Sequence, residues 1–290
     1  MMKLTLLGTG RMGLPMARRL CQAGHEVHVW NRSADKAQPL VADGATVHAG
    51  LTAAVAAGEI VISLLENGPV VASVLFEQGA AAAMRPGTLF VDMASIKPAE
   101  AREHAARLAE RGVRHLDAPV SGGTVGAEAG TLAIMAGGEA ADFARALPVL
   151  QVLGRATHVG PHGAGQLAKL ANQMIVGITI GAVAEALLLC AKGGADPAQV
   201  REAIGGGFAQ SRILELHGER MVRRDFAPRA RMTVQLKDLR NALDTARAMD
   251  FEAPITAALE QLYADGVAHG DSELDHSGLF VELARRNGMS

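Results

Sequence analysis

The sequence has few aromatic residues, few cysteines and no excess of either charge. Aromatic side chains make up 3% of the 290 residues, which argues against a surface that stacks nucleic-acid bases or sugar rings. Lys and Arg number 28 against 30 Asp and Glu, so nothing provides a basic field for a phosphate backbone, and nucleic acid is not expected as a partner. With only Cys21 and Cys190, no disulfide framework is expected. We expect both cysteines to be small, buried hydrophobic residues. Free thiols fit a protein in a reducing cytoplasm.

The chain also lacks a clear targeting or membrane signal. The apolar run at residues 1–8 is too short for a signal peptide and has no cleavage-site pattern. Residues 170–191 carry a single charge, Glu185, and are long enough to cross a bilayer, which takes about 20 residues. Asn172 and Gln173 interrupt the start of this stretch, and no other segment resembles it. We therefore expect a long helix buried between domains, no membrane partner and a cytoplasmic location.

The first half of the sequence alternates apolar runs with helical patterns. The runs predict buried strands at residues 4–7, 26–30, 60–65, 88–92, 113–117 and 132–136. Helical patterns between them are clearest at residues 11–23, 33–43 and 98–111. Strands that alternate with helices predict βαβ units and a doubly wound parallel sheet.

The second half carries no strand signal after about residue 160 and is rich in Ala and Leu at helical spacing. At roughly 150 residues per domain, the length also favours two domains. We expect an α/β domain over residues 1–161 and an all-helical domain over residues 162–290. A long interdomain helix at about residues 163–192 opens the second domain.

Glycine is the residue in surplus, at 33 of 290, and its positions indicate ligand loops. Gly8, Gly10 and Gly13 form a G-x-G-x-x-G motif, with Arg11 and Met12 inside it, between the first strand and the first helix. That context predicts a dinucleotide-binding loop of the Rossmann type. The first glycine permits the turn, the second lets backbone approach a pyrophosphate, and the helix N-terminus favours the anion.

The residues after the second strand predict which dinucleotide binds. An NAD-selective site places Asp or Glu here to accept a hydrogen bond from the ribose hydroxyl, but this chain has Asn31, Arg32 and Ser33. Arg32 could hold a 2′-phosphate with its guanidinium fork, and Asn31 and Ser33 could add neutral hydrogen bonds. We predict NADP(H) over NAD(H). The alternative is a solvated loop arginine and a serine that caps the next helix.

A second glycine cluster follows the strand that ends near Asp117. Ser121 offers a hydroxyl, and Gly122 and Gly123 expose backbone N–H groups to a small anion. The pattern suggests a pocket for a carboxylate, with an ordinary loop as the alternative. No group of His, Cys or carboxylate residues has the spacing of a zinc site, so no metal is expected.

Two polar residues interrupt the apolar helix near its start. Lys169 and Asn172 are three residues apart and therefore share one helix face. A lysine at a domain junction is partly desolvated, which makes it a usable proton donor. From these residues alone, a lysine that extends its charge to solvent is an equal alternative.

Together these motifs resemble the β-hydroxyacid dehydrogenase family over nearly the whole chain. The resemblance rests on four motifs in order, at residues 8–16, 117–123, 163–172 and 237–239. It implies a Rossmann-like domain followed by a helical domain and metal-free hydride transfer between a nicotinamide coenzyme and a small carboxylate substrate. It also implies a homodimer or homotetramer built on the helical halves.

The resemblance also implies roles for individual residues. Lys169 matches the family's catalytic lysine, and Asn172 matches the asparagine that binds substrate and orients that lysine. Ser121, Gly122 and Gly123 match the loop that binds the substrate carboxylate.

Further matches concern the coenzyme. Lys237 matches a lysine that closes over coenzyme and substrate, and Ser95 matches a contact on the nicotinamide side. Leu65 falls at a coenzyme-contacting loop, but here Leu-Glu-Asn stands where many members have Leu-Pro before the asparagine.

Within the family, residues 236–244 and 275–277 resemble members that reduce tartronate semialdehyde, which implies reduction of that substrate to glycerate. Residues 228–231 read Pro-Arg-Ala-Arg and depart from the Pro-Gly-Phe pattern that usually accompanies this substrate. Oxidation of 3-hydroxyisobutyrate or L-threonate and reduction of succinic semialdehyde are the alternatives in the family.

Three other classes are disfavoured. Imine reductases look similar in fold but lack a lysine at the position of Lys169. A 6-phosphogluconate dehydrogenase is considerably longer and carries a histidine beside its asparagine, whereas Ala171 precedes Asn172 here. A non-catalytic NADP-binding module usually loses the lysine or gains further domains.

Overall fold

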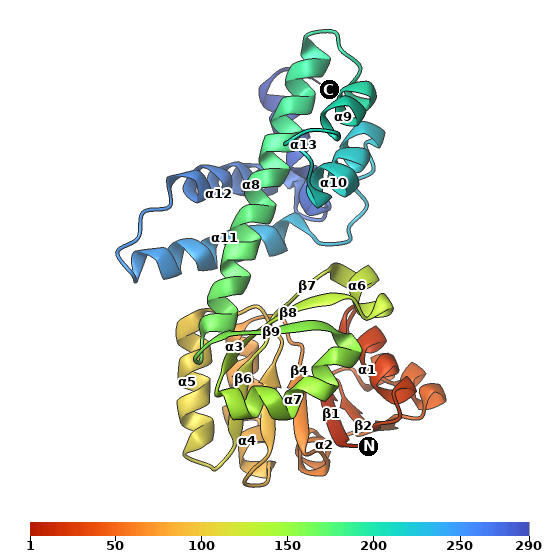
Figure 1. The fold of residues 1–290 in the computed structure, drawn as a ribbon, viewed down its shortest axis with the longest axis vertical. Helices are drawn as coiled ribbons and strands as arrows, with labels where there is room; N and C mark the ends of the chain where they lie inside the picture. Colours follow the sequence, from red (N-terminus) through yellow and green to blue (C-terminus); the bar gives the residue numbers. More distant parts are fainter. Residues whose placement is uncertain (290) are drawn as a thin grey trace. The chain divides into compact units, whose positions relative to one another are not determined.

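The structure is a computed structural model that describes residues 1–289. It divides into two compact units, one over Met1–Lys169 and one from Leu170 onward (Figure 1). The expected boundary at residues 161/162 lies eight residues earlier. The division falls later because the first turns of the long helix α8, Ala164–Lys192, are hydrogen-bonded to the first unit.

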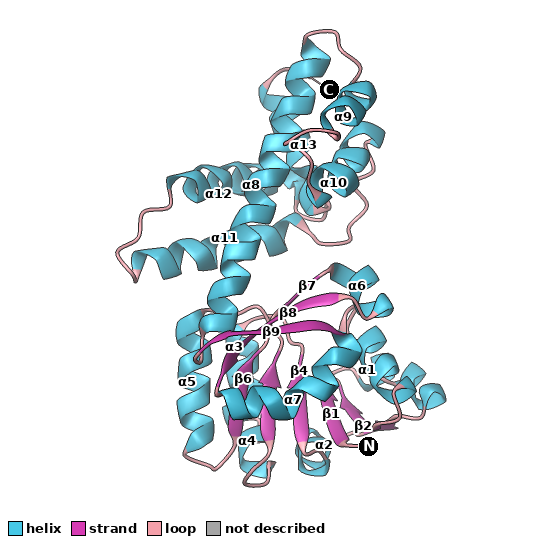
Figure 2. Ribbon diagram, in the orientation of Figure 1, coloured by secondary structure: helices cyan, strands magenta, loops and turns pink. Residues whose placement is uncertain are grey.

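The first unit is built on a nine-stranded sheet in the order β3-β2-β1-β4-β5-β6-β8-β7, with β9 paired to β8 (Figure 2). Strands β1 to β6 run parallel, whereas β8 is antiparallel to β6 and to β7. The strands are β1 Lys3–Leu7, β2 Glu26–Trp30, β3 Thr46–Val47, β4 Ile60–Ser63, β5 Leu89–Asp92, β6 Arg114–Asp117, β7 Val120–Ser121, β8 Leu132–Gly138 and β9 Gly154–Gly160. The predicted doubly wound sheet is confirmed.

Helices cover both faces of this sheet because alternate side chains of the central strands are apolar in both directions. Ile60 and Ile62 of β4 pack in a core with α1 and α7, and Val61 between them packs in a second core with α2, α3 and α5. The helices of this unit are α1 Gly13–Gln22, α2 Leu51–Ala57, α3 Gly68–Ala72, α4 Ala80–Ala83, α5 Pro98–Ala109, α6 Gly123–Ala129 and α7 Ala140–Leu153.

Two details of the sequence prediction differ from the structure. The helix expected over residues 33–43 is two 3-10 turns, Ala34–Lys36 and Gln38–Asp43. Pro39 explains the break, because proline has no N–H to donate and its ring clashes with the preceding turn of an α-helix. The strands β3, β7 and β9 were not predicted. β3 and β7 have two residues each, and exposure alternates along β9, so none has the continuous apolar run that marked the others.

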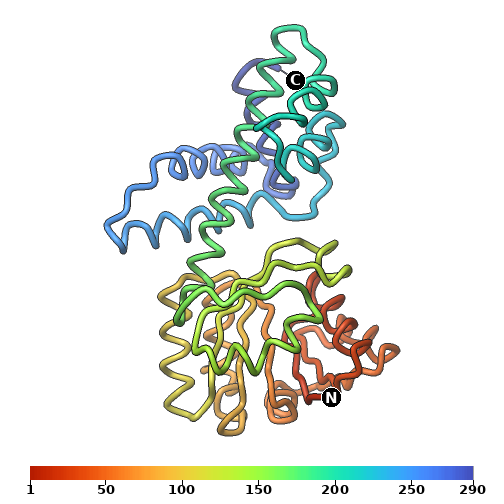
Figure 3. The backbone as a smooth tube through the Cα atoms, in the orientation of Figure 1, coloured from red at the N-terminus to blue at the C-terminus, as the bar shows by residue number. Residues whose placement is uncertain are grey.

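The second unit is entirely helical over its described residues. Its elements after α8 are α9 Pro197–Ile204, α10 Arg212–Arg223, α11 Met232–Arg247, α12 Pro254–Gly266 and α13 Leu279–Arg286. Tyr263 is its largest fully buried side chain and packs among apolar residues of α8, α10, α11 and α13. Helices α11 and α12 lie side by side, which Figure 3 shows as a blue pair.

The long apolar helix α8 is present as expected, but much of its surface is exposed. Only 39% of its most apolar 18-residue window is buried within the chain. Leu167, Ile175 and Leu189 are 43%, 66% and 72% exposed. They are 8 and 14 residues apart, about two and four helical turns, so they lie along one stripe of the helix. Length and composition alone would let α8 cross a bilayer, and a core helix of a soluble protein passes the same test.

The two cysteines are free thiols, but neither is fully buried. Cys21 and Cys190 are both half-buried, and Cys21 packs against the core that includes β1 and α1. The expectation that both are buried is therefore met only in part.

Candidate active site

The glycine loop after β1 turns tightly against two neighbouring strands. The Gly8 N–H donates to the Trp30 carbonyl at the end of β2, at 2.9 Å, and Gly8 has a φ of +97°. A Cβ at Gly8 would lie 2.5 Å from the Leu64 carbonyl oxygen after β4, and one at Gly13 would lie 1.9 Å from the Gly8 carbonyl oxygen. The fold itself therefore requires glycine at both positions.

Gly10 is different, because neither steric contact nor backbone conformation requires glycine there. No atom lies within 4 Å of a Cβ built there, and its φ is not positive. Helix α1 begins beside it with no side-chain cap at Met12 and no acidic residue in its first turn. Open space at Gly10 beside an uncapped helix N-terminus fits the pyrophosphate of a dinucleotide, with Arg11 and Met12 in the same turn.

The loop after β2 is tied directly to the glycine loop. Asn31 accepts a hydrogen bond from the Thr9 N–H at 3.0 Å and donates to the Ser33 carbonyl at 2.9 Å. Its amide therefore fixes the two loops, a role that the sequence did not indicate. The Arg32 side chain is exposed and has no hydrogen-bond or ion-pair partner among residues 1–289, and the Ser33 side chain does not cap the following turn.

Leu65 lies beside the glycine loop. Its Cδ2 would be 3.2 Å from a Cβ at Gly8. Asn67, two residues later, caps α3 by accepting a hydrogen bond from the Val70 N–H at 3.0 Å.

Two buried carboxyl groups lie side by side at the carboxyl ends of the next two strands, where ligands bind in doubly wound sheets. Asp92 of β5 and Asp117 of β6 are register partners, and both are fully buried. Asp92 Oδ1 accepts from the Ser63 hydroxyl at 2.7 Å and the Ala94 N–H at 3.0 Å, while its buried Oδ2 has no partner. Burial, with a smaller contribution from the Asp117 and Glu100 charges, raises the pKa of Asp92 to about 7.

Asp117 caps the start of α8. Its Oδ1 accepts from the Gly163 N–H at 2.8 Å and its Oδ2 from the Gln166 N–H at 2.9 Å. Burial raises the pKa of Asp117, and these two hydrogen bonds oppose that rise by stabilising the carboxylate. A Cβ at Gly165 would lie 2.4 Å from the Asp117 carbonyl oxygen, so glycine there lets the helix approach the strand end.

The second glycine cluster lies at the exposed junction of β7 and α6. Ser121 ends β7, and its hydroxyl has no partner among the described residues. Gly122 and Gly123 have φ values of +137° and +63°, and a Cβ at Gly123 would have no atom within 4 Å. The backbone geometry therefore explains why these are glycines and leaves polar groups open to a ligand.

The two polar residues predicted on the long helix occupy its first turns. Lys169 is 8% exposed, closes the first unit, and follows Gln166 by three residues on the same helix. Asn172 is the third residue of α8 within the helical unit and is half-buried. Its side chain donates to the Gln173 side chain at 2.8 Å.

Lys237 lies on α11 in a polar network of the helical unit. Its Nζ is 3.1 Å from Asp238 Oδ1, and Asp238 Oδ2 accepts from Gln173 at 2.7 Å. Asp238 is 2% exposed, so its carboxylate is buried within this network. Gln173, which the sequence interpretation did not single out, connects the side chains of Asn172 and Asp238.

One cluster of the helical unit has the composition of a metal site. His217, Asp275 and His276 place one ligand atom each within 4.8 Å of one another. Asp275 is saturated, however: Oδ1 accepts from Arg220 at 3.0 Å and from the Ser277 hydroxyl at 2.7 Å, and Oδ2 accepts from the Arg229 and Ala230 N–H groups. A metal cation there would lie beside the positive guanidinium of Arg220, which disfavours binding. The hydrogen bonds of Asp275 instead hold the segment before α11 in place.

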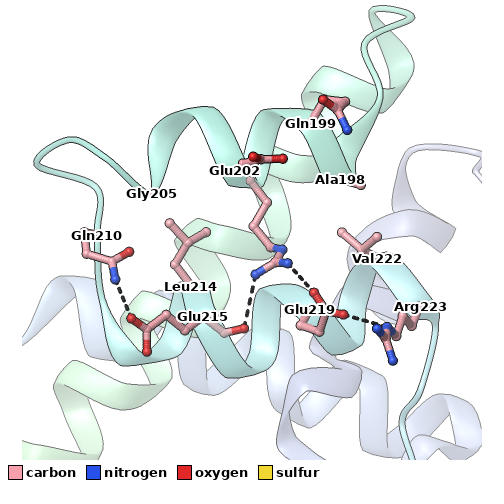
Figure 4. Close-up of a pocket in the computed structure, with 11 residues that line it drawn as sticks. Ala198, Gln199, Glu202, Gly205, Gln210, Leu214, Glu215, Glu219, Val222 and Arg223 are labelled. Atoms are coloured by element: carbon pink, nitrogen blue, oxygen red, sulfur yellow. Dashed lines mark hydrogen bonds and ion pairs between the residues drawn. The ribbon is translucent and has the colours of Figure 1, made fainter.

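A groove of about 580 Å³ in the helical unit lies between α9 and α10 (Figure 4). All of its charged groups except Glu202 have partners among the described residues. Glu219 binds Arg201 and Arg223, and Glu215 accepts from Gln210. None of the residues predicted for the site lines it.

Replacing Gly10 and Gly13 by alanine should separate ligand binding from folding. Gly13→Ala should lower stability by about 3 kcal/mol or more, because its Cβ overlaps a backbone oxygen. Gly10→Ala should keep the thermal midpoint of the unliganded protein and weaken NADP(H) binding at least about tenfold, which costs about 1.4 kcal/mol. Gly50→Ala, another glycine with open space around it, is the control and should change neither property. Normal binding by Gly10→Ala would contradict the assignment.

Asp92→Asn should change how stability depends on pH. The folded-state pKa of Asp92 is about 7 against an ordinary 3.8, so raising the pH through this window destabilises the wild-type fold. Asparagine cannot ionise, so the variant should gain stability relative to wild type between pH 5 and pH 8, by about 3 kcal/mol. Denaturant unfolding at both pH values measures this, with the exposed Asp35→Asn as control. A stability difference that is the same at both pH values would disprove it.

Comparison with known proteins agrees with this geometry. Residues 3–160 match the model for the NAD-binding domain of 6-phosphogluconate dehydrogenase. Residues 163–283 match the model for the NAD-binding domain of NADP-dependent 3-hydroxyisobutyrate dehydrogenase. Each model covers one half of the chain, in the expected order.

Similar proteins cover the chain almost completely. The 2-hydroxy-3-oxopropionate reductase of Escherichia coli is 45% identical over 284 residues, 97% of both chains. The 3-hydroxyisobutyrate dehydrogenase of Pseudomonas aeruginosa is 38% identical over 288 residues, 96% of both. A solved structure of Mycobacterium tuberculosis 3-hydroxyisobutyrate dehydrogenase with L-serine has a TM-score of 0.90 and 34% identity, covering 98% of this chain and 99% of that one. The chain therefore belongs to the 3-hydroxyisobutyrate dehydrogenase-like family of β-hydroxyacid dehydrogenases, which are NAD(P)-dependent oxidoreductases.

Proposed function

We propose that the protein is an NADP(H)-dependent reductase that converts a small carboxylate-bearing semialdehyde to a hydroxyacid, with tartronate semialdehyde to glycerate as the favoured reaction. The observation that carries the proposal is Lys169, a buried lysine in the first turns of α8 just after the capped helix start. The similarity to the E. coli 2-hydroxy-3-oxopropionate reductase supports the choice of substrate.

The chemistry assigned to the chain is proton transfer and charge stabilisation. A nicotinamide coenzyme supplies the hydride when bound. As the aldehyde carbon is reduced, negative charge builds on its oxygen, and Lys169 protonates that oxygen and stabilises the charge as a cation. In the oxidising direction, neutral Lys169 takes the proton of the alcohol. No step of this mechanism calls for a metal.

The remaining roles follow from chemistry and from the family. Ser121, Gly122 and Gly123 hold the substrate carboxylate with a hydroxyl and backbone N–H groups, for which the unpartnered Ser121 hydroxyl is support. Asn172 binds the substrate and orients Lys169. The coenzyme is contacted by the glycine loop and by Leu65, Ser95 and Lys237.

Lys169→Ala should lower kcat by about 10³-fold or more, because it removes both the proton donor and the cation. Binding of NADPH, followed by its fluorescence, should remain close to wild type. Lys192→Ala, at the exposed end of the same helix, is the matched control and should keep full activity. Near-normal turnover by Lys169→Ala would reject the mechanism.

The preference for NADP(H) rests on Arg32. This exposed guanidinium has no partner among the described residues and follows a strand whose end is hydrogen-bonded to the glycine loop. No carboxylate stands at residues 31–34 to repel a 2′-phosphate.

Steady-state kcat/KM with each coenzyme tests this preference. Wild type should favour NADPH, and Arg32→Ala should lose about tenfold or more with NADPH and little with NADH, since only NADPH has the 2′-phosphate. Arg85→Ala, also exposed and in the same unit, should leave the ratio unchanged. A wild-type preference for NADH would overturn the assignment.

The substrate is the part of the proposal with the most alternatives. Residues 228–231, whose sequence departs from the pattern that accompanies tartronate semialdehyde, lead into α11. Turnover of tartronate semialdehyde, succinic semialdehyde and methylmalonate semialdehyde with NADPH separates the candidates by kcat/KM. A panel with no turnover would favour oxidation of L-threonate or a non-catalytic coenzyme-binding module.

We also propose that the chain forms a homodimer or homotetramer through α8. Its exposed apolar stripe suits a second copy of itself, because an isologous interface pairs the same patch on both subunits. Ile175→Glu should shift the mass measured by sedimentation toward the monomer, whereas Val41→Glu, on an exposed turn of the first unit, should not. A monomeric wild type would refute this.

A further inference from the structure

Gln166 is completely buried, and its side-chain amide is used on both sides. Its Oε1 accepts from the Ile96 N–H at 3.0 Å, and its Nε2 donates to the Ala94 carbonyl at 2.8 Å. Its own backbone N–H donates to Asp117. A single side chain in the first turn of α8 therefore hydrogen-bonds to backbone groups 70 and 72 residues earlier in the sequence.

These two backbone groups flank Ser95. The peptide group before Ser95 is held by the Gln166 amide at the Ala94 carbonyl, and the Ala94 N–H is held by Asp92 at 3.0 Å. On the other side, the Ile96 N–H is held by Gln166. The loop after β5 is thus fixed before and after the residue assigned to the nicotinamide side of the coenzyme.

The position of Gln166 also fixes the position of the Lys169 backbone. The two residues are three apart on α8, within the turn that Asp117 caps, and Lys169 is 8% exposed. Since a helix turn is stiff and both contacts of the Gln166 amide are buried, the distance from Ser95 to the start of Lys169 has little freedom.

We propose that Gln166 is a positioning residue for the reaction: its amide binds the Ser95 loop to the helix turn of Lys169 and so fixes the nicotinamide contact and the proton donor in one frame. The inference rests on the proposed function. Its physical basis is that hydride and proton transfer need both groups in place at once, and a displacement near 1 Å can cost about 10²-fold in rate.

The test compares Gln166→Met, which has similar length and removes both hydrogen bonds, with Gln78→Met. Gln78 belongs to the same unit and uses its amide only on the surface, with Ser73. Gln166→Met should lower kcat by about 10- to 100-fold with a much smaller change in the substrate KM and in NADPH binding. The primary deuterium isotope effect on kcat, measured with 4-deuterated NADPH, should rise as hydride transfer becomes slower. Gln78→Met should behave as wild type.

A second variant addresses the case in which Gln166→Met does not fold. Gln166→Asn keeps the amide but is one methylene shorter, so it should lose much of the activity of wild type while remaining folded. Full activity in either folded variant would overturn the proposal. So would a loss of kcat accompanied by an equal loss of NADPH binding or of thermal stability, because that pattern indicates a structural role alone.

Hydrogen exchange makes the test independent of the substrate. In the protein without ligands, the peptide that contains Ile96 should exchange faster in Gln166→Met or Gln166→Asn than in wild type, and unchanged exchange would overturn the proposed contact. If wild type turns over no semialdehyde while this exchange still rises, the proposed function fails and the link between the Ser95 loop and α8 stands.

Discussion

The buried carboxylate of Asp117 is the interaction on which the arrangement of the site depends. It accepts the Gly163 and Gln166 N–H groups, which would otherwise be unsatisfied at the start of a 29-residue helix. Because Asp117 ends a central strand, these two hydrogen bonds fix the start of α8 at the end of β6. Everything assigned to the first turns of α8 depends on that placement. Burial raises the pKa of this carboxyl, and the two N–H donors offset part of that rise.

A second carboxyl group, Asp92, takes part in the same construction with a different electrostatic character. It lies beside Asp117, has one oxygen without a partner, and its pKa of about 7 makes ionisation costly in the fold. Two adjacent buried carboxyls cannot both be charged cheaply. Both donors to Asp92 bind the same oxygen, whereas each oxygen of Asp117 accepts one N–H. Groups with perturbed pKa values concentrate at functional sites. This pair lies at the edge of the sheet formed by the carboxyl ends of the parallel strands, and the glycine loop after β1 lies at the same edge.

The sequence predicted the parts of this structure that have local signals. The central strands were found from apolar runs, the glycine loop from its spacing, and α8 from its length. Gln166, the capping role of Asp117 and the protonation of Asp92 were not found, because each depends on contacts with segments 29 to 72 residues away. The linking role of Asn31 was hidden for the same reason. The apolar spacing over residues 33–43 predicts one helix, but Pro39 divides the segment into two 3-10 turns.

The position of the unit boundary inside α8 has a consequence for how the protein could be divided. The sequence suggested a cut after residue 161, yet the first unit continues to Lys169. A chain ending at 161 would leave the Asp117 carboxylate buried without its two donors, and the Ser95 loop would lose both bonds from Gln166. An isolated dinucleotide-binding domain of this protein therefore needs the opening turns of a helix whose remainder belongs to the other unit. Recombination between relatives that preserves function should accordingly cross over after residue 169 and not at the loop before α8.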